Sequence, residues 1–483
     1  MYRRTILQFR TRTESHLSCL TFDVFVDWLD MNRWNSVSCI LLFHLYCSLD
    51  VCEAFLNVQH LSKVSSVRSL RHHPNSLVAT ISRRDLMISS SVLSSSLAMK
   101  KDDKEIGWGI VGLGDVCAVK AGPAFVKCDG SRLVAVMRRT PGAAAQWMKD
   151  HASFVPTDCR PYDDLDQFLN DPELDAVYIA TPPESHVQVA EKVAQAGKIA
   201  YIEKPVGRCA AETQAIINAF QTKNNLPLFT AYTSRAFDRT KLIQQLLKDG
   251  VIGDKVTHIS YKLTGSSVVR GLEDTSSSLP WRMDAAKSGG GLIMDVGCHL
   301  LDRLDYLFGP LIHVHGEAIT KSKSSKVEDY VNIHASIGSK VTTLYDDPII
   351  KSEGASVNCT WDFASEEDDP VDELRIIGSN GKSLQMAGQS PSAPIYVMDA
   401  NNDTIEQEIT SFHVPNHTTQ PLLQMIVNEL RGKEGKSPSR TDNALRTSQV
   451  LDTALSSFYG NRDIGFWDHP ETWPGLSKST VPK

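Results

Sequence analysis

The stretch that decides the fold reads Gly109-Ile-Val-Gly-Leu-Gly-Asp-Val-Cys117. It completes an apolar run that begins at Ile106, so residues 106–111 are expected to form a buried β-strand. Gly112 allows the sharp turn that ends this strand, and Gly114 leaves the backbone open to close approach by a ligand. A helix is expected over Val116–Val126. The stretch therefore predicts a strand, a glycine turn and a helix in direct succession.

A strand, turn and helix of this kind can bind a dinucleotide, because the pyrophosphate is held by the N–H groups at the helix N-terminus. We therefore expect Gly112, Gly114, Asp115 and Val116 to contact NAD or NADP. Cys117 occupies the third position of the Gly-x-Gly-x-x-Gly pattern. It is small enough to let the helix pack closely on the strand.

Four further apolar segments follow with helical segments between them. The expected strands are Leu133–Met137, Ala176–Ala180, Ile199–Ile202 and Leu226–Tyr232, and the expected helices are Ala143–His151, Asp163–Asn170 and Ser185–Ala196, the last ended by Gly197. Strands that are apolar on both faces and alternate with helices are typical of a doubly wound parallel sheet. Residues 105–232 are therefore predicted to form an α/β domain of the Rossmann type that binds NAD(P).

The pattern changes after residue 232. The expected strands are now Val256–Leu263, Leu311–Ile319, Tyr330–Ile337, Val357–Phe363 and Glu373–Ile377, with a hairpin turn at Gly378–Gly381 and late helices at Pro421–Arg431 and Asn443–Phe458. Few helices separate the strands, which predicts an α+β domain over residues 233–467 with a large, mainly antiparallel sheet. Residues 468–483 are expected to be a tail. No apolar segment is long enough to span a membrane.

The end of the second predicted strand carries Arg138 and Arg139. An acid at this position, about twenty residues after the glycines, would favour NAD because it binds the ribose hydroxyls. Guanidinium groups instead suit the 2′-phosphate of NADP, to which they donate bidentate, charge-assisted hydrogen bonds. The alternative is a solvated basic loop. The two arginines therefore favour NADP as the cofactor, with NAD as the second choice.

The next strand ends in Ala180-Thr-Pro-Pro-Glu-Ser-His186. The prolines stop the strand, and Glu184 or Ser185 can cap the helix that follows. We expect Thr181, Pro182 and His186 at the cofactor crevice. For His186 the alternative is an exposed side chain at a helix start.

Two later stretches carry groups suited to acid–base chemistry. Glu203-Lys204-Pro205 ends the fourth predicted strand, where a parallel sheet binds its ligands. Asp295 and His299 follow the triple glycine Gly289–Gly291 and are four residues apart, so they share one face of a helix. The alternative for the second stretch is a capping aspartate and a surface histidine.

Taken together, these motifs resemble the Gfo/Idh/MocA oxidoreductases, the relatives of glucose–fructose oxidoreductase and inositol dehydrogenase. The resemblance runs from Glu105 to Trp467. It rests on the glycine stretch, on Ala-Thr-Pro-Pro with His186, on Glu203-Lys204-Pro205 and on Asp295-x-Gly-x-His299. It implies a Rossmann domain followed by a domain whose sheet forms homo-oligomers and whose face closes the substrate pocket. Cys117 and the Arg138-Arg139 pair depart from the commonest form of the family pattern.

The resemblance also implies roles for particular residues. Lys204, Asp295 and His299 would form the catalytic set, and Glu203, Lys204 and Pro205 would also contact the cofactor. Tyr232, Trp281 and Arg282 would line the substrate pocket. The expected activity is hydride transfer between NADP and a sugar, a polyol or a related hydroxyl or carbonyl compound. The alternative is a regulator or sensor that binds the dinucleotide without turnover.

The composition of the 483-residue chain is that of a globular protein, with 41% hydrophobic and 22% charged residues. Its formal net charge of −7 gives no basic surface for nucleic acid, so a small molecule is the expected partner. The ten cysteines include no Cys-x-x-Cys pair. Neither a disulfide framework nor a metal site is therefore expected.

Residues 1–104 are expected to be a targeting leader or a disordered extension. Ser36–Leu49 suits the apolar region of a signal peptide, Phe55–Arg84 is rich in Ser, Lys and Arg without Asp or Glu, and a twin-arginine-like pattern at Ser82–Met87 precedes Ile88–Ala98. The combination resembles the bipartite plastid leader of algae with complex plastids. The alternative is an over-extended reading of the gene or a disordered tail, which would leave the protein in the cytoplasm.

Overall fold

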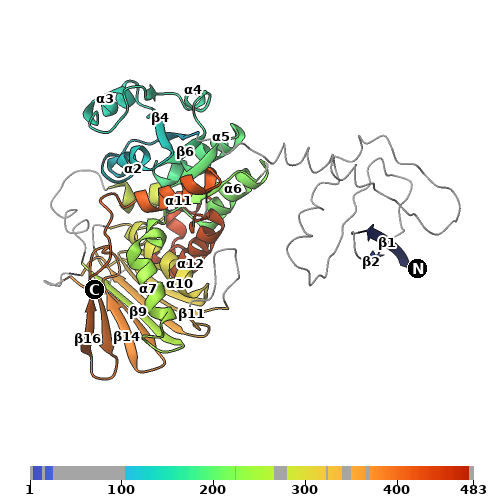
Figure 1. Cartoon of the computed structure of the whole chain (residues 1–483). Coiled ribbons are helices and arrows are strands. Elements are labelled where there is room, and N and C mark those ends of the chain that lie inside the picture. Colours follow the sequence, from blue (N-terminus) through green and yellow to red (C-terminus); the bar gives the residue numbers. More distant parts are fainter. Residues whose placement is uncertain are drawn as a thin grey trace. The chain divides into compact units, whose positions relative to one another are not determined.

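The computed structural model describes residues 4–12, 17–25, 104–223, 225–265, 280–322, 325–339, 350–365, 370–433 and 435–477. The chain divides into two units, Met1–Lys100 and Lys101–Lys483. In the first unit, β1 (Arg4–Arg12) and β2 (Leu17–Phe25) pair as an antiparallel hairpin (Figure 1). The segments predicted to direct targeting, 36–49, 55–84, 82–87 and 88–98, lie outside the described residues.

The second unit begins with a six-stranded, entirely parallel sheet. Its strands are β3 (Ile106–Val111), β4 (Ser131–Met137), β5 (Arg160–Tyr162), β6 (Ala176–Ile179), β7 (Ile199–Ile202) and β8 (Leu228–Thr230), in the spatial order β5-β4-β3-β6-β7-β8. The strand order reverses between β3 and β6, and ligands of open α/β sheets bind at such a switch point. The predicted doubly wound parallel sheet is confirmed.

Burial explains which strands the sequence pattern detects. The central strands are apolar on both faces, and Trp108, Ile110 and Tyr178 are fully buried between layers of helices. Those helices are α2 (Gly122–Lys127), α3 (Ala143–Asp150), α4 (Leu165–Leu169), α5 (His186–Gln195) and α6 (Ala210–Gln221). Gly197, with a φ of 70°, ends α5 as predicted. The edge strand β5 was not predicted because its three residues include Pro161 and none of them is buried.

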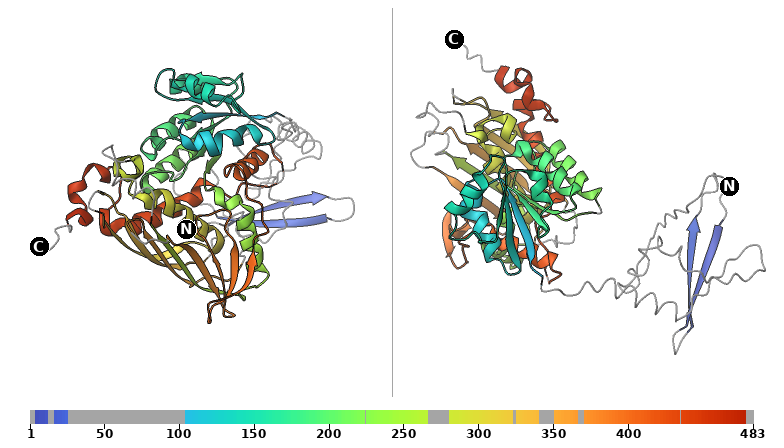
Figure 2. Two further views of the ribbon diagram at one scale, coloured as in Figure 1. Left: turned by 90° about the vertical axis from the view of Figure 1, so that its left-hand side faces the viewer. Right: turned by 90° about the horizontal axis from the view of Figure 1, so that it is seen from above.

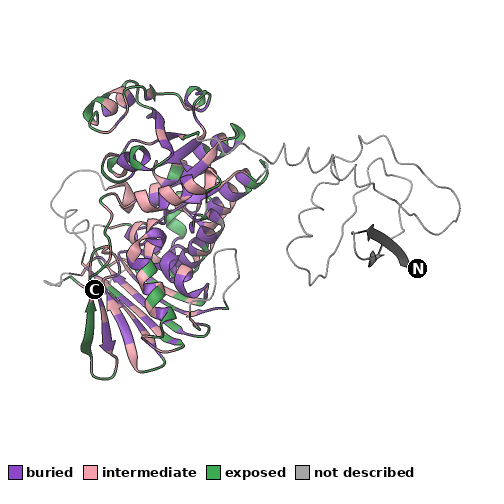
Figure 3. Cartoon of the chain, viewed as in Figure 1, coloured by how far each residue is buried: buried purple, intermediate pink, exposed green. Residues whose placement is uncertain are grey.

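The second sheet has eight strands and is mainly antiparallel. They are β9 (Val256–Thr264), β10 (Leu311–Ile319), β11 (Tyr330–Ile337), β12 (Ser356–Asp362), β13 (Asp372–Gly378), β14 (Lys382–Met386), β15 (Ile395–Asp399) and β16 (Thr404–Ile409), in the order β10-β11-β12-β9-β13-β14-β15-β16. Only β12 and β9 run parallel among these neighbours. The strands β14 to β16 extend the predicted sheet, and β16 forms an exposed edge (Figure 3).

Two helices of the second domain lie between the sheets. Figures 1 and 2 show α10 (Cys298–Phe308) and α12 (Thr441–Tyr459) on the side of the large sheet that faces the small one. Gly316 on β10 permits this packing, because a Cβ there would lie 2.0 Å from the carbonyl oxygen of Ala454. Helix α7 (Asp238–Lys248) follows the first sheet along the chain.

Helix α11 (Gln420–Leu430) returns the chain to the first sheet. Its buried side chains Leu422, Leu423, Ile426 and Val427 belong to the same core cluster as Trp108 and Phe125. The core of the first sheet is thus completed by residues that follow the whole of the second sheet in sequence.

We predict that Ile426→Ala destabilises the protein by about 2–5 kcal/mol, because it leaves a cavity in a core that cannot collapse fully. Ile405→Ala is the matched control. Ile405 is 61% exposed on β16, so its truncation should change the free energy of unfolding by less than about 0.5 kcal/mol. Urea denaturation of both variants measures the difference. Equal effects would contradict the place of α11 in the core.

Candidate active site

The glycine turn lies at the switch point between β3 and β6. Gly112 has a φ of 95°, and a Cβ on it would lie 2.8 Å from backbone atoms of Ala180 and Thr181. Only glycine therefore allows the two strand ends to approach this closely. Gly114 differs, because nothing lies within 4 Å of the position that its Cβ would take. Its open backbone has room for a pyrophosphate.

A helix begins directly after this turn. It starts at Asp115 and continues through the π-helical turn η3 (Cys117–Ala121) into α2. The first N–H groups of a helix have no acceptor within it and attract anions. The open backbone at Gly114 and these N–H groups together fit the phosphates of a dinucleotide.

Arg138 and Arg139 stand beside this turn. They follow β4, whose last residue Met137 accepts a hydrogen bond from the N–H of Gly112 at 3.1 Å. Both side chains are exposed, and within the described residues neither has a hydrogen-bond or ion-pair partner. Two unpaired guanidinium groups therefore lie next to the predicted cofactor site.

The segment after β6 is held by a buried histidine. The ring nitrogens of His186 lie 2.7 Å from the Thr181 carbonyl oxygen and 3.0 Å from that of Val206. Burial lowers the pKa of His186, and a neutral ring donates to one of these carbonyls at a time. His186 is neither exposed nor open to the crevice. It ties the Thr181-Pro182 turn to the segment that follows Lys204.

Glu203 directly follows β7 and has its carboxylate inside the protein. It accepts hydrogen bonds from the Tyr178 hydroxyl and, at 3.1 Å, from the N–H of Lys204. Burial raises its pKa. These contacts hold the end of β7 in place, and with it the backbone of Lys204. The peptide bond between Lys204 and Pro205 is cis.

Asp295 brings together two cations from distant parts of the chain. The Nζ of Lys204 donates to its Oδ1 at 2.5 Å and to its backbone oxygen at 2.9 Å. The Nε of Arg282 donates to Oδ2 at 2.7 Å. Burial opposes ionisation of Asp295, yet the two cations outweigh it and hold the pKa of this carboxyl well below its usual 3.8. In the same way Asp295 offsets burial and raises the pKa of Lys204 to about 12.

The triple glycine Gly289–Gly291 allows the segment before Asp295 to pack closely against its neighbours. A Cβ on Gly289 would lie 2.3 Å from the Arg208 oxygen, and one on Gly291 would lie 2.2 Å from the Glu328 oxygen. The buried Glu328 carboxylate also accepts hydrogen bonds from the N–H of Gly291 at 2.8 Å and from the Tyr459 hydroxyl. Close packing on both sides therefore fixes the turn that leads to Asp295.

Asp295 itself lies in a π-helical turn, η7 (Ile293–Gly297), which runs into α10. Such turns within helices are frequently found at functional sites. His299 follows on the first turn of α10. The predicted pair therefore does share a helical segment, although the turn that carries Asp295 is wider than an α-helix.

His299 is neutral in this setting. Burial and the nearby positive charge of Lys204 hold its pKa well below the ordinary 6.5, and these effects exceed the opposing attraction of Asp295. Tyr232, which is buried, packs its ring edge-on against His299 with the centroids 6.4 Å apart. A neutral imidazole can accept a proton.

Trp281 and Arg282 lie in the short helix η6 (Trp281–Met283). The Arg282 guanidinium lies 4.3 Å from the centroid of the Trp281 ring, while its Nε holds Asp295. The segment therefore reaches the predicted catalytic set. That Tyr232, Trp281 and Arg282 contact substrate stays a prediction.

Sequence reasoning missed Glu328 and Arg208. Arg208 donates to the Ala286 carbonyl at 2.7 Å and to Glu212, and it thereby holds the segment that carries Arg282. A single acid before a strand and a single arginine after a turn carry no local signal. Their roles depend on partners about forty and eighty residues away.

Other functional features were also sought in the described residues. No group of three or more His, Cys, Asp or Glu there is placed to hold a metal ion. None of the helices found there is long and apolar enough to cross a membrane. The six cysteines from Cys117 to Cys359 in this part of the chain are free and buried.

The switch point, the open glycine turn and the Lys204–Asp295–Arg282 contact define a class of protein, a dinucleotide-dependent oxidoreductase. Comparison with known sequences identifies the family. The model of the oxidoreductase family with an NAD-binding Rossmann fold, GFO_IDH_MocA, matches residues 106–232, and that of the GFO/IDH/MocA C-terminal domain matches residues 240–383. The chain belongs to the GFO/IDH/MocA oxidoreductases, as its motifs predicted, and its cofactor is a nicotinamide dinucleotide.

Relatives and solved structures agree with this assignment. Oxidoreductase P35 of Formosa agariphila is 28% identical over 72% of this chain and 98% of its own length. An NADP(+)-dependent scyllo-inositol 2-dehydrogenase of Bacillus subtilis is 26% identical over 40% of this chain and 51% of its own. The structure of levoglucosan dehydrogenase in complex with NADH matches with a TM-score of 0.59 and 18% identity, covering 73% of this chain and 97% of that one.

The charge of Lys204 gives a prediction for His299. Lys204→Met removes the repulsion that disfavours the imidazolium and leaves Asp295 free to attract it, so the pKa of His299 should rise toward 6.5. An NMR pH titration, with the His299 signal assigned through His299→Asn, measures the change. Lys192→Met on α5 is the control and should leave the pKa unchanged. A pKa that stays constant or falls in Lys204→Met would contradict this account of the electrostatics.

Proposed function

We propose that the protein is a dehydrogenase or reductase that prefers NADP and acts on a hydroxyl or carbonyl group of a sugar, a polyol or a related compound. The observation that carries the proposal is the Asp295 carboxylate, which binds Lys204 and Arg282 beside the neutral His299. A base, a hydrogen-bond donor and an orienting acid therefore meet at the edge of a nucleotide-binding sheet.

His299 is the proposed general base. Its low pKa keeps it unprotonated near neutral pH, so it can take the proton of a substrate hydroxyl and return it in the reverse direction. The bound nicotinamide supplies the complementary chemistry by accepting or releasing a hydride. Tyr232 supports the histidine by packing against its ring.

Lys204 is the proposed donor to the reacting oxygen. An ammonium group has three N–H donors, and Asp295 engages its Nζ through two oxygens. One donor is left for the substrate, where it would stabilise the negative charge that develops on the oxygen as the proton leaves. Asp295 fixes the direction of this donor, and Arg282 holds Asp295 from the other side.

The cofactor would be held by residues of four strand ends. These are Gly112, Gly114, Asp115 and Val116 after β3, Arg138 and Arg139 after β4, Thr181, Pro182 and His186 after β6, and Glu203, Lys204 and Pro205 after β7. His186 and Glu203, both turned inward, would act by fixing the strand ends rather than by touching the dinucleotide. The exposed, unpaired guanidinium groups of Arg138 and Arg139 support NADP over NAD.

Membership of the family supports the proposed substrate class and the proposed homo-oligomer. The relatives named above act on inositol and on levoglucosan, which supports a polyol or a sugar as the substrate. We propose 105–232 and 233–467 as the two functional domains, with α11 packed on the first. We also propose that the large sheet forms homo-oligomers, as the family resemblance implies, through the face of β11 and β12 that is partly exposed.

The catalytic assignment predicts the loss of turnover in two variants. His299→Asn and Lys204→Met should each lower kcat by about 10²–10⁴-fold, because each removes a group that acts on the transferred proton or the charged oxygen. The matched control is His413→Asn, in which an exposed histidine is replaced and kcat should not change. Turnover is followed by NADPH absorbance with the sugar or polyol that gives the highest rate in a substrate panel.

The same panel tests the alternative of a regulator or sensor. NADPH binding without turnover of any sugar, polyol or related carbonyl compound would favour that alternative. Normal turnover in Lys204→Met would instead show that the protein is an enzyme but that the proposed role of Lys204 is wrong.

Cofactor choice gives a separate prediction. Arg138→Ala and Arg139→Ala should each raise the KM for NADPH by about tenfold or more, since each removes a charge-assisted hydrogen bond to the 2′-phosphate. The KM for NADH should change by less than about twofold, because NADH lacks that phosphate. Lys149→Ala, in which an exposed cation of α3 is removed, is the control. An equal loss with both cofactors would contradict the proposed NADP preference.

A further inference from the structure

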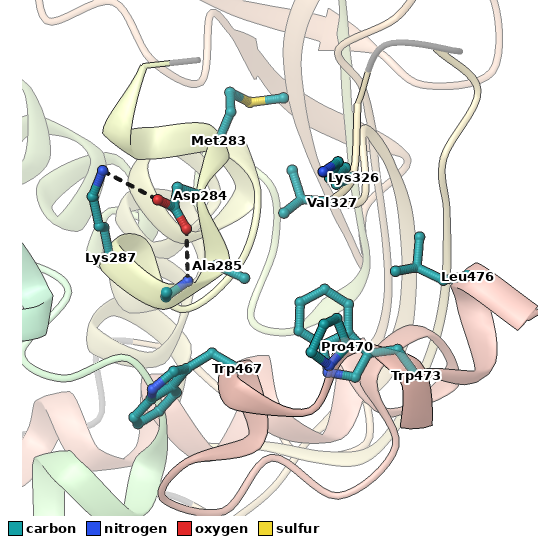
Figure 4. A pocket seen from close by; sticks show the side chains of 11 residues that line it. Met283, Asp284, Ala285, Lys287, Lys326, Val327, Trp467, Pro470, Trp473 and Leu476 are labelled. Carbon is teal, nitrogen blue, oxygen red and sulfur yellow. Dashed lines mark hydrogen bonds and ion pairs between the residues drawn. The ribbon is translucent and has the colours of Figure 1, made fainter. Parts of the chain in front are cut away.

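A pocket of about 410 Å³ lies apart from the proposed catalytic set, between the segment of α9 (Ala285–Ser288) and the C-terminal part of the chain (Figure 4). Its wall includes Lys326 and Val327, which precede β11, and Trp467, Trp473 and Leu476 near the C-terminus. None of Lys204, Asp295 and His299 lines it. Pockets of this volume are large enough to hold a small organic ligand.

The lower wall of this pocket is aromatic. Trp473 is buried, and its indole N–H is already donated to the Phe466 carbonyl at 2.9 Å, so it offers a ligand no hydrogen-bond donor. Trp467 is held in place by the Arg208 guanidinium, 3.4 Å from its ring centroid. Figure 4 shows both rings below Val327 and Lys326, with Leu476 beside Trp473. Such walls favour a ligand with a flat, apolar ring.

Among the described residues that line the pocket, one cation, Lys326, is not paired with an acid. Lys287 is paired with the Asp284 carboxylate at 3.2 Å, so these two lining residues cancel. Lys326 is exposed and has no hydrogen-bond or ion-pair partner within the described residues. A single ammonium group matches one negative charge. A monoanion is therefore the simplest match, because the other lysine of the lining is already engaged by Asp284.

We propose that this pocket is a second ligand site that binds a small planar monocarboxylate. The ring of the ligand lies against Trp467 and Trp473, and its carboxylate accepts a hydrogen bond from the Nζ of Lys326. The site is separate from the catalytic set, but both contact one segment. Arg282 reaches Asp295, and the following residues Met283 to Lys287 line the pocket.

Benzoate is the probe for this site, titrated into the full chain and followed by calorimetry. One saturable site is expected, with a Kd of about 1 mM or below, as the size of the ligand allows. Lys326→Glu should weaken binding by about tenfold or more, because it replaces attraction by repulsion. Benzyl alcohol, which has the ring without the charge, should bind about tenfold more weakly or worse. Lys248→Glu, an exposed lysine of α7, is the matched control and should bind as the wild type does.

Two further variants make the result decisive. Val327→Trp fills the pocket and should abolish binding, and Lys204→Met should retain it, because Lys204 is not part of the pocket. Lys326→Glu alters an exposed side chain, so it serves as the deciding variant if Val327→Trp fails to fold. The proposal is overturned if no saturation occurs up to about 50 mM benzoate. It is also overturned if Lys326→Glu binds like the wild type, or if binding is lost in Lys204→Met.

Discussion

The carboxylate of Asp295 is the contact on which the proposed active site depends. It binds two cations, Lys204 from the end of the parallel sheet and Arg282 from the segment before the triple glycine. The turn before Asp295 requires glycine, because a Cβ on Gly289 or Gly291 would clash with the backbone of Arg208 or Glu328. The position of the Asp295 carboxylate therefore depends on these two glycines.

This contact also sets the protonation states around it. Asp295 stays ionised despite its burial, and Lys204 stays charged for the same reason. The charged lysine in turn helps to keep His299 neutral. One ion pair thus determines which group carries a proton and which can receive one, as the assignment of an acid and a base in a single pocket requires.

Local patterns predicted the parts of the fold that depend on local physics. The strands around Trp108 and Tyr178 are apolar on both faces, and Gly112 and Gly197 mark their turns, so the order of elements could be read directly. The motifs likewise led to Lys204 and Asp295, which the structure brings into contact. The burial of His186, the anchoring of Gly291 by Glu328 and the return of α11 to the first sheet could not be predicted. Each depends on a partner distant in sequence, and no period or turn signal records such a partner.

The return of α11 has a consequence for how the chain is made. A ribosome releases the N-terminal sheet first, and domains generally fold as they emerge. Here the apolar cluster around Trp108 and Phe125 is incomplete until Leu422, Ile426 and Val427 have been synthesised. The nascent nucleotide-binding sheet therefore exposes the apolar surface on which α11 packs until the second sheet has been translated. A gene fragment cut at residue 232 would inherit the same face permanently, so a soluble cofactor-binding fragment needs α11 joined back to it.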